Sequence, residues 1–374
     1  MVRIAIIMGK MHSGGKKNLV MEYYRHIDRD KVQFDFLCDE DSNSIPEEEI
    51  VSLGGRVYRI PSYKRVFSNI AAIRRICREN KYQIMHGYNS TVNVISMLAG
   101  KMAGVPIRIN ECISMGHKED KKNLIKNVLK LFPGLFSTHY MANGEACGKW
   151  QFGRKAYEEG KIRVFKSVID VNVNRYDPEL RQRTRRELGV EDNLVIGHIG
   201  RLTIQKNSLF LIDIFNEIVK REPKARLLLI GDGDMREDVL KRIDGYQLQD
   251  KVLYLGRRED VRQFYNAMDA FLLPSLYEGL PVVGLEAECC GLPMFFSTEI
   301  PRESSPCDDI GFFVSLKRGA AGWAKLVLST MKKCGERRDR SEDIIEKGFD
   351  STREGKALTE YYLELLGNSG ESIV

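Results

Sequence analysis

Short apolar runs alternate with longer amphipathic stretches along almost the whole chain. In the first half, VRIAIIM (2–8) and VQFDFLC (32–38) have the length of buried strands, and FSNIAAIRRICREN (67–80) has apolar residues at helical spacing. Strands that alternate with helices in this way indicate βαβ units and a parallel sheet. The other elements predicted in this half are strands at 56–60, 82–86, 106–110 and 139–143, and helices at 14–27 and 93–104.

The rhythm breaks at FKSVIDVNVNRYDPE (165–179), a polar and turn-rich stretch that we interpret as a linker, and then restarts. The strands predicted after it are at 193–200, 225–233, 251–256, 270–275 and 293–297, and the helices at 208–222, 235–246, 261–269 and 281–291. A chain of 374 residues suits two domains. The pattern therefore predicts a two-domain α/β protein with a cleft between domains 1–172 and 173–354.

Composition is that of a globular protein, with 43% hydrophobic and 29% charged residues. The first apolar run is too short for a signal peptide, and no stretch approaches the ~20 apolar residues of a membrane span. The eight cysteines are scattered and show no CxxC spacing. Reduced, packed thiols and a cytoplasmic location are therefore expected.

The net charge of +6 is unevenly distributed. Residues 1–172 contain 28 Lys and Arg against 18 Asp and Glu, whereas the remainder contains 30 against 34. A basic first half suggests an anionic partner for it, such as phosphate groups, a membrane surface or nucleic acid. No nucleic-acid partner is expected, because the basic residues lack interleaved aromatic residues and no known nucleic-acid-binding module is present. Solvated helix faces and contact with an anionic membrane both fit its basic residues, of which the most concentrated are Arg74, Arg75, Arg78, Lys122 and Lys126.

Ligands of open parallel sheets bind at the carboxyl ends of the strands, so residues just after strands are the first candidates. In the first half, Gly14-Gly15 follows a strand and precedes a helix, where both a plain turn and an approach to an anion fit. His86 ends a predicted strand, and a structural and a ligand-facing histidine are both open there.

In the second half, Arg201 and Lys206 share the loop after a strand, a spacing that suits a diphosphate. Asn207 and Ser208 follow as the predicted cap of a helix, whose positive end beside Lys206 favours a bound anion. The GDGD turn beginning at Gly231 is explained better by turn and capping chemistry than by a metal. No metal ligand set is predicted.

The stretch PSLYEGLPVVGLEAECCG (274–291) carries two glutamates among apolar residues. We predict a helix that has Pro281 at its first position, continues from Val282 to Cys290 and is stopped by Gly291. Glu278 would then project at the mouth of the cleft beside the amides of the helix start, and Glu286 would lie enclosed in the helix. An enclosed carboxylate needs polar partners, which a structural salt bridge or the hydroxyls of a ligand would supply.

These motifs together resemble the family 4 retaining glycosyltransferases, most closely the bacterial branch of capsule and exopolysaccharide synthesis. The resemblance is strong over 195–297, in GRLTIQKN, LLLIGDGDMREDV, VLYLGRREDV and PSLYEGLPVVGLEAECCGLP. It is looser over 1–170, in SGG, His86, VPIRI and ACGKWQFG. It implies a GT-B fold, in which two Rossmann-like domains face each other across a central cleft. An acceptor would bind the first domain and a nucleotide sugar the second, and a helix at about 355–374 would return to the first domain.

The resemblance also implies roles for individual residues. Arg201 and Lys206 would neutralise the departing diphosphate, Glu286 would hold the ribose hydroxyls, and Glu278 with nearby amides would hold the donor sugar. The full set implied for the donor is Gly14, Gly15, Gly200, Arg201, Lys206, Gly231, Arg257, Val261, Glu278, Gly279, Leu280 and Glu286. The set implied for the acceptor is His86, Asn89, Arg108 and Glu111, and the set implied for catalysis is His86, Arg201, Lys206 and Glu278.

The expected activity is transfer of a hexose or N-acetylhexosamine, with retention and without a metal or other cofactor, from a UDP-sugar to a glycan or lipid-linked acceptor. The chain departs from the branch at Asn110–Ser114 and at Gly148, both in the acceptor half. Two alternatives therefore stay open. One is a UDP-sugar 2-epimerase of the same architecture, and the other is a non-catalytic partner subunit that activates another transferase.

Overall fold

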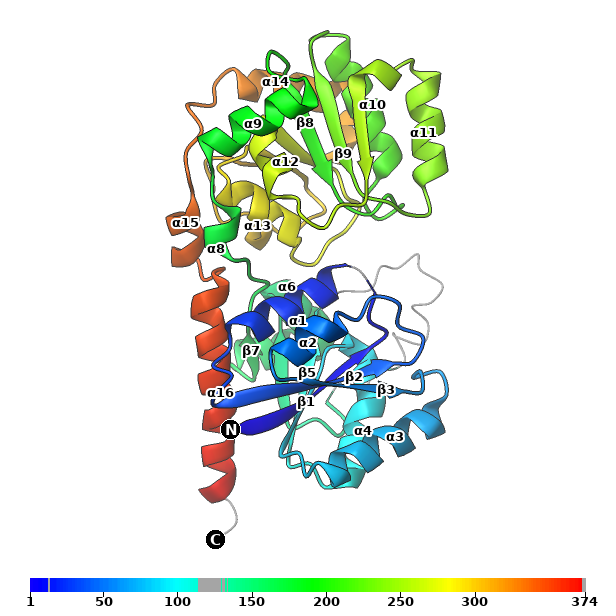
Figure 1. Ribbon diagram of the computed structural model, residues 1–374, viewed down its shortest axis with the longest axis vertical. Helices are drawn as coiled ribbons and strands as arrows, with labels where there is room; N and C mark the ends of the chain where they lie inside the picture. Colours follow the sequence, from blue (N-terminus) through cyan, green and yellow to red (C-terminus); the bar gives the residue numbers. More distant parts are fainter. Residues whose placement is uncertain (13, 114–128, 130–131, 133, 372–374) are drawn as a thin grey trace. The chain divides into compact units, whose positions relative to one another are not determined.

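The computed structural model describes residues 1–12, 14–113, 129, 132 and 134–371, with no side-chain description beyond 367. The chain divides into two compact units (Figure 1). Unit 1 comprises Met1–Val168 and Asp350–Val374, and unit 2 comprises Ile169–Phe349. These divisions lie four and five residues before the predicted ones.

Unit 1 is built on a seven-stranded sheet of order β3-β2-β1-β4-β5-β6-β7, in which every pair of neighbours is parallel. Its strands are β1 (Val2–Gly9), β2 (Val32–Asp39), β3 (Arg56–Ile60), β4 (Ile84–Gly87), β5 (Ile107–Cys112), β6 (His139–Ala142) and β7 (Ile162–Val164). Its helices are α1 (Gly15–His26), α2 (Glu47–Ser52), α3 (Val66–Glu79), α4 (Asn93–Ala103), α6 (Glu145–Phe152), α7 (Arg154–Glu158) and α16 (Ser351–Glu371).

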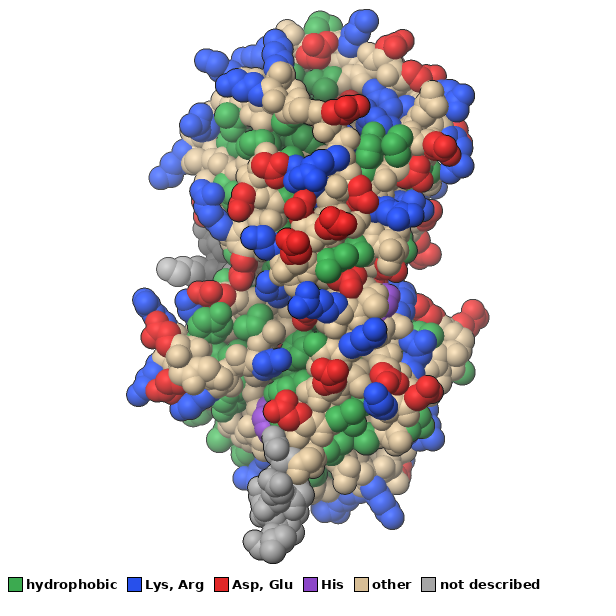
Figure 2. All heavy atoms as spheres, turned by 90° about the vertical axis from the view of Figure 1, so that its left-hand side faces the viewer, with side chains coloured by type: hydrophobic (Ala, Val, Ile, Leu, Met, Phe, Trp, Pro, Cys, Tyr) green, Lys and Arg blue, Asp and Glu red, His purple; other side chains and the backbone are tan. Residues whose placement is uncertain are grey.

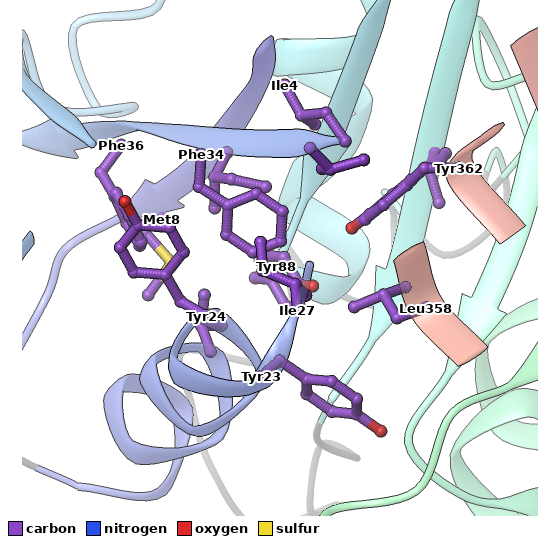
Figure 3. Packing of buried hydrophobic residues seen from close by; sticks show 14 of the residues in the cluster. Ile4, Met8, Tyr23, Tyr24, Ile27, Phe34, Phe36, Tyr88, Leu358 and Tyr362 are labelled. Atoms are coloured by element: carbon purple, nitrogen blue, oxygen red, sulfur yellow. The ribbon is translucent and has the colours of Figure 1, made fainter. Parts of the chain in front are cut away.

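The alternation of side chains along β1 divides the core of unit 1 into two layers. Ile4 and Ile6 pack on the face covered by α1, α2 and α16, and Ala5 and Ile7 pack on the face covered by α3 and α4. This is the period of two that a strand buried on both faces requires. Figure 3 shows α16 contributing Leu358 and Tyr362 to the first layer. The last helix therefore folds as part of the first unit.

Unit 2 repeats the architecture with a six-stranded parallel sheet of order β10-β9-β8-β11-β12-β13. Its strands are β8 (Val195–Ile199), β9 (Arg226–Ile230), β10 (Val252–Gly256), β11 (Ala270–Leu273), β12 (Met294–Ser297) and β13 (Gly311–Val314). Its helices are α8 (Val171–Asn174), α9 (Pro178–Leu188), α10 (Ser208–Val219), α11 (Arg236–Gly245), α12 (Arg262–Ala267), α13 (Val282–Cys289), α14 (Gly319–Met331) and α15 (Ser341–Glu346). The predicted α/β class with two parallel sheets is confirmed.

Several elements were not predicted. The strands β7 and β13 are only three and four residues long, too short for periodicity to identify. The helix α9 was missed because PELRQRTRREL contains only two leucines and no apolar stripe. At α13 the prediction was nearly right, but Pro281 is the N-cap residue and Val282 the first helical one.

Candidate functional site

The order of strands in unit 2 places a switch point between β8 and β11. On one side of β8 lies β9, the next strand along the chain, and on the other side lies β11. Loops that leave two such strands diverge to opposite faces and open a crevice at the carboxyl edge of the sheet. The loop after β8 contains Arg201 and Lys206, and the loop after β11 contains Glu278, so the strongest predicted residues lie at this point.

The two loops are joined by an ion pair and by backbone contacts. Lys206 Nζ lies 2.6 Å from Glu278 Oε1, and both side chains are largely buried. The amide of Leu276 donates to the carbonyl of Gln205 (2.8 Å), and the Asn207 side chain donates to the carbonyl of Pro274 (3.1 Å). The pair therefore sits on a rigid frame of two strand ends.

Asn207 is the N-cap residue of α10, as predicted, but its side chain makes no capping hydrogen bond. Asn207 has a left-handed backbone (φ 56°), and its side-chain amide is used for the contact with Pro274 instead. The side chain of Ser208 turns back and accepts from the amide of Thr203 (3.1 Å). The start of α10 is therefore where the sequence predicts it. The side chains of Asn207 and Ser208 bind the two loops instead of capping the helix.

The loop after β9 closes against the loop after β8 at Gly231. A Cβ on Gly231 would lie 1.8 Å from the carbonyl oxygen of Gly200, and its φ is +136°. Only glycine fits both this contact and this backbone conformation. Because the amide of Leu202 then donates to the carbonyl of Asp232 (3.1 Å), the β8 loop is braced from both sides.

Arg201 differs from Lys206 in having no partner. Its side chain is exposed and forms no hydrogen bond or ion pair with any residue that the structure describes. In the same part of the chain, the amide N–H groups of Glu278, Gly279 and Leu280 donate to no acceptor among the residues that the structure describes. One edge of the sheet therefore carries a cation and three amide donors that lack partners among the described residues. Such a set suits an oxyanion or sugar hydroxyls.

Glu286 accepts a hydrogen bond from the Tyr265 hydroxyl (2.7 Å), and burial raises the pKa of that phenol well above its usual value. The predicted contrast between the two glutamates is reversed, since Glu278 is 8% exposed and Glu286 is half-buried. The reason is that Lys206 covers Glu278, a contact between loops that no local pattern shows.

Arg257 and Val261 follow the edge strand β10, farther along the sheet, and Arg257 lies exposed 3.9 Å from Glu259.

In unit 1, the corresponding switch lies between β1 and β4. Gly14 and Gly15 stand at the start of α1, and a Cβ on either would meet no atom within 4 Å. Asn89 is close by, because Lys16 Nζ donates to its Oδ1 (2.9 Å) as well as to the carbonyl of Met8. Burial lowers the pKa of Lys16 to about 8. Lys16 was missed by the sequence analysis, although its place beside the glycine pair was a signal.

His86 and Glu111 lie in the core of unit 1 and have almost no exposed surface. His86 Nε2 is 2.9 Å from Glu111 Oε2, His86 Nδ1 bonds to the Tyr362 hydroxyl (2.7 Å), and the ring stacks on Tyr88. The prediction that these two side chains face a sugar or an acceptor receives no support from this buried position, because α16 and the core enclose them.

Arg108 lies near the amino end of β5, away from the carboxyl edge. Its guanidinium donates to the carbonyls of Val105 (2.5 Å), Pro106 (3.2 Å) and Phe136 (2.6 Å), and burial lowers its pKa. These contacts fix a turn, so its position does not support a role with the acceptor. Lys122 and Lys126 lie outside the described residues.

None of the described helices is long and apolar enough to cross a membrane. The part of the chain with described side chains contains no group of three or more His, Cys, Asp or Glu arranged to hold a metal ion.

Comparisons with known proteins agree with the geometry of unit 2. Residues 193–332 match the family described as Glycosyl transferases group 1. The chain is 28% identical to the putative glycosyltransferase EpsF of Bacillus subtilis over 96% of both chains. It is 24% identical, over 79% of each chain, to the UDP-Gal:alpha-D-GlcNAc-diphosphoundecaprenol alpha-1,3-galactosyltransferase of Escherichia coli. Among solved structures, Anabaena HepE in complex with UDP-glucose superimposes with a TM-score of 0.79 at 18% identity, covering 96% of this chain and 99% of that one.

The fold and these similarities together indicate a glycosyltransferase of the GT-B class. Within that class, residues 193–332 match the group 1 glycosyltransferases, also called family 4, a family of retaining and metal-independent enzymes.

Proposed function

We propose that the protein transfers a hexose or N-acetylhexosamine from a UDP-sugar to a lipid-linked or glycan acceptor in the synthesis of a capsule or exopolysaccharide. The observation that carries the donor part of this proposal is the pairing of Lys206 with Glu278 across the β8–β11 switch, beside Arg201, which has no partner among the described residues. Two cations and one carboxylate therefore lie at one edge of the sheet. The cations suit a diphosphate, and the carboxylate suits sugar hydroxyls.

Binding of the donor would satisfy each of these groups. Arg201 and Lys206 would contact the diphosphate, and Glu278 would exchange part of its contact with Lys206 for donor-sugar hydroxyls. The free amides of Gly279 and Leu280 would add donors at the same place, and Glu286 would hold the ribose with Tyr265 orienting its carboxylate. Burial of the pair in a largely dry site strengthens each of these contacts.

In the proposed reaction, the bond between the anomeric carbon and the diphosphate oxygen breaks, and a bond from the acceptor oxygen forms on the same face of the sugar. The proton of the acceptor hydroxyl passes to the departing phosphate oxygen. Negative charge grows on the diphosphate, so cations fixed beside it lower the barrier. Loss of one such group typically costs about 10²–10³ in kcat.

The acceptor part of the proposal has support of two kinds. The Escherichia coli relative is named for a diphosphoundecaprenol acceptor, and the Erwinia amylovora relative is named for amylovoran biosynthesis. In unit 1, Gly14, Gly15, Lys16 and Asn89 form a polar, partly open edge that suits a phosphate or sugar.

A panel of UDP-, GDP- and ADP-sugars tests the donor, with binding measured by thermal shift and hydrolysis measured by release of the nucleotide. We expect UDP-sugars to raise the melting temperature most. If none of the donors binds or is hydrolysed, the enzymatic proposal is wrong.

Both alternatives are tested on the same protein. Conversion of a UDP-sugar without any acceptor would favour a 2-epimerase. If Glu278→Ala left polysaccharide production in cells unchanged, a non-catalytic partner subunit would be favoured instead.

We further propose peripheral contact with an anionic membrane through α3. Phe67, Ala71, Arg75 and Arg78 share the exposed face of this helix, and Phe67 is 89% exposed. An exposed ring beside cations is typical of interfacial binding. On the face shown in Figure 2, by contrast, basic and acidic side chains are interspersed over both units.

Vesicle sedimentation tests this contact, using phosphatidylglycerol–phosphatidylcholine vesicles against pure phosphatidylcholine. We expect binding to the anionic vesicles only, weakened by Phe67→Ser and unchanged by Val51→Ser, a matched change at a 58% exposed residue of α2. Equal binding of Phe67→Ser and the unchanged protein would contradict the proposal.

The eight cysteines are all free, which fits a reducing compartment and hence a cytoplasmic face.

A further inference from the structure

Strand β8 carries a buried histidine that neither the motif nor the proposed chemistry uses. His198 lies one residue before the end of the strand, and its side chain has no exposed surface. The loop that follows it holds Arg201 and Lys206. Buried polar groups are expected to have hydrogen-bond partners, so each of the two ring nitrogens should have one.

One ring nitrogen of His198 joins the two strands of the switch point. Nδ1 lies 2.8 Å from the carbonyl oxygen of Leu272 in β11. The backbone pairing of β8 with β11 ends at Gly197 and Phe271, whereas β8 stays paired with β9 up to Ile199. The ring therefore binds β11 at the level where the two strands stop pairing.

The contact with Leu272 also fixes the tautomer of the ring. A carbonyl oxygen only accepts, so Nδ1 carries the proton and Nε2 of the neutral ring presents a lone pair. Burial lowers the pKa of His198 to about 4, and the nearby charge of Lys206 acts in the same direction. Nε2 is therefore an acceptor, and it has no hydrogen-bond partner among the described residues.

The unpartnered Nε2 lies close to the loop of the donor site. A Cβ placed on Gly200 would lie 3.2 Å from His198 Nε2 and 3.6 Å from Lys206 Cε, so both side chains approach the same point of the backbone. The ammonium of Lys206 has three protons to donate, and Glu278 is its partner among the described residues. A free lone pair and an ammonium with protons to spare thus lie near one glycine.

This arrangement gains a use when a diphosphate enters the site. The phosphates compete with Glu278 for the ammonium of Lys206, because charge-assisted hydrogen bonds to phosphate are strong. An ammonium in a largely buried setting needs acceptors for its remaining protons, since unmet donors there are costly. Nε2 of His198 is an acceptor without a described partner at this place.

We propose that His198 is a positioning residue for Lys206, whose ammonium donates to Nε2 while it contacts the diphosphate of the donor. The ring thereby holds the cation at the phosphates when Glu278 turns to the donor sugar. This role rests on the proposed function, because it takes the β8 loop as the diphosphate site. Its consequence is that the affinity for UDP depends on an acceptor at the position of Nε2.

Two substitutions separate the two nitrogens of the ring. The side-chain amide in His198→Asn can replace Nδ1 and keep the bond to Leu272, but no group then stands at the position of Nε2. The amide oxygen in His198→Gln can replace Nε2 as an acceptor, and the donor at Nδ1 is lost.

The first test is the affinity of both variants for UDP, measured by isothermal titration calorimetry. We expect the dissociation constant to rise at least about tenfold in His198→Asn and to stay within about threefold of wild type in His198→Gln. Equal affinities of the two variants would overturn the proposal. The reverse order would also overturn it, because the bond to Leu272 would then be the part of the ring that matters.

A double-mutant cycle tests whether the effect passes through Lys206. In the Lys206→Met background, His198→Asn should change the affinity for UDP by less than about twofold. In the Arg201→Ala background it should keep an effect of about tenfold, because Arg201 is a separate cation of the same loop. Ligand-detected NMR measures the weaker affinities. Equal losses in the two backgrounds would show that His198 does not act through Lys206.

A measurement on the wild-type ring covers the case in which His198→Asn does not fold. The six histidines are isotope-labelled for nitrogen NMR, and the signal of His198 is identified by its absence in His198→Gln. We expect Nε2 to be unprotonated in the free protein and its signal to move toward that of a hydrogen-bonded nitrogen when UDP is added. In Lys206→Met the signal should not move. An Nε2 signal that UDP leaves unchanged in wild type would refute the role of His198.

The outcomes separate the two claims. If UDP does not bind the wild-type protein, the proposed donor site is wrong and the role of His198 falls with it. If UDP binds wild type and His198→Asn equally well, the donor site stands and the role of His198 is refuted.

Discussion

At the scale of single residues, the donor site depends on a near-buried ion pair whose members serve both stability and binding. Lys206 and Glu278 are 2.6 Å apart, with side chains 13% and 9% exposed. The Coulomb attraction of such a pair is largely offset by desolvation, but loss of one member leaves the other charge uncompensated. Stability and activity should therefore respond differently to single and double changes.

We predict that Lys206→Met lowers the free energy of unfolding by roughly 3 kcal/mol, and that Lys206→Met with Glu278→Gln recovers most of this loss. Transferase activity should stay lost in both. Chemical denaturation and donor hydrolysis measure the two effects. The exposed pair Lys220–Glu217 is the control, since its disruption should cost less than ~1 kcal/mol. Recovery of activity in the double variant would contradict the assigned roles.

The raised pKa of Glu288, a buried residue of α13, makes a separate prediction for stability. An acid whose pKa is about 8 in the folded state and 4.5 in the unfolded state binds its proton more tightly when folded. Stability from this group is then full below pH ~4.5 and is lost as pH rises to about 8, by at most about 1.4 kcal/mol per pH unit. Relative to wild type, Glu288→Gln should gain stability over this window in denaturation at pH 5 to 9. A constant difference would mean that Glu288 is ionised throughout.

At the scale of elements, the packing of α16 determines the surroundings of His86, the histidine near the end of β4. This helix comes from the end of the chain, yet it places Tyr362 in the core of unit 1 (Figure 3). There the Tyr362 hydroxyl lies 2.7 Å from His86 Nδ1. The hydroxyl and the imidazole are each other's partner in a dry setting. A buried polar group left without its partner costs about 1–3 kcal/mol.

We therefore expect Tyr362→Phe to lower the free energy of unfolding of unit 1 by about 1–3 kcal/mol. Tyr361→Phe is the matched change on the same helix, because the structure shows no hydrogen bond from that hydroxyl to a described residue, and it should cost less than ~0.5 kcal/mol. Denaturation followed by circular dichroism checks both. Equal effects of the two changes would show that the contact with His86 contributes nothing.

What the sequence could and could not predict follows from the range of the interactions involved. Strands, helices and the residues after them obey local patterns, so Arg201, Lys206, Gly231 and Glu278 were correctly located at strand ends. The burial of His86 depends on a helix some 270 positions later, and the covering of Glu278 depends on a loop about 70 positions earlier. Side-chain partners across such separations leave no trace in the local pattern, so the sequence left the setting of His86 open and did not show that Lys206 covers Glu278.

At the scale of the whole molecule, the two units provide unequal evidence. Unit 2 combines a fold, a family match over 193–332 and a polar site whose unmet donors are identified residue by residue. Unit 1 has a comparable edge at Gly14, Lys16 and Asn89. Asn89 belongs to the implied acceptor set, but His86, Arg108 and Glu111 lie elsewhere in this unit. The donor can therefore be tested by specific variants now, whereas the acceptor requires a screen.

The most direct test of the central claim is the affinity of UDP for wild type and Arg201→Ala by isothermal titration calorimetry. Arg201 is exposed and contacts no described side chain, so its removal should leave stability unchanged and report on the ligand alone. We predict at least about tenfold weaker binding, or about 1.4 kcal/mol, while Arg318→Ala on the same unit binds as wild type. Unchanged affinity in Arg201→Ala, or no binding of UDP to the wild-type protein, would contradict the assignment of the β8–β11 edge as the donor site.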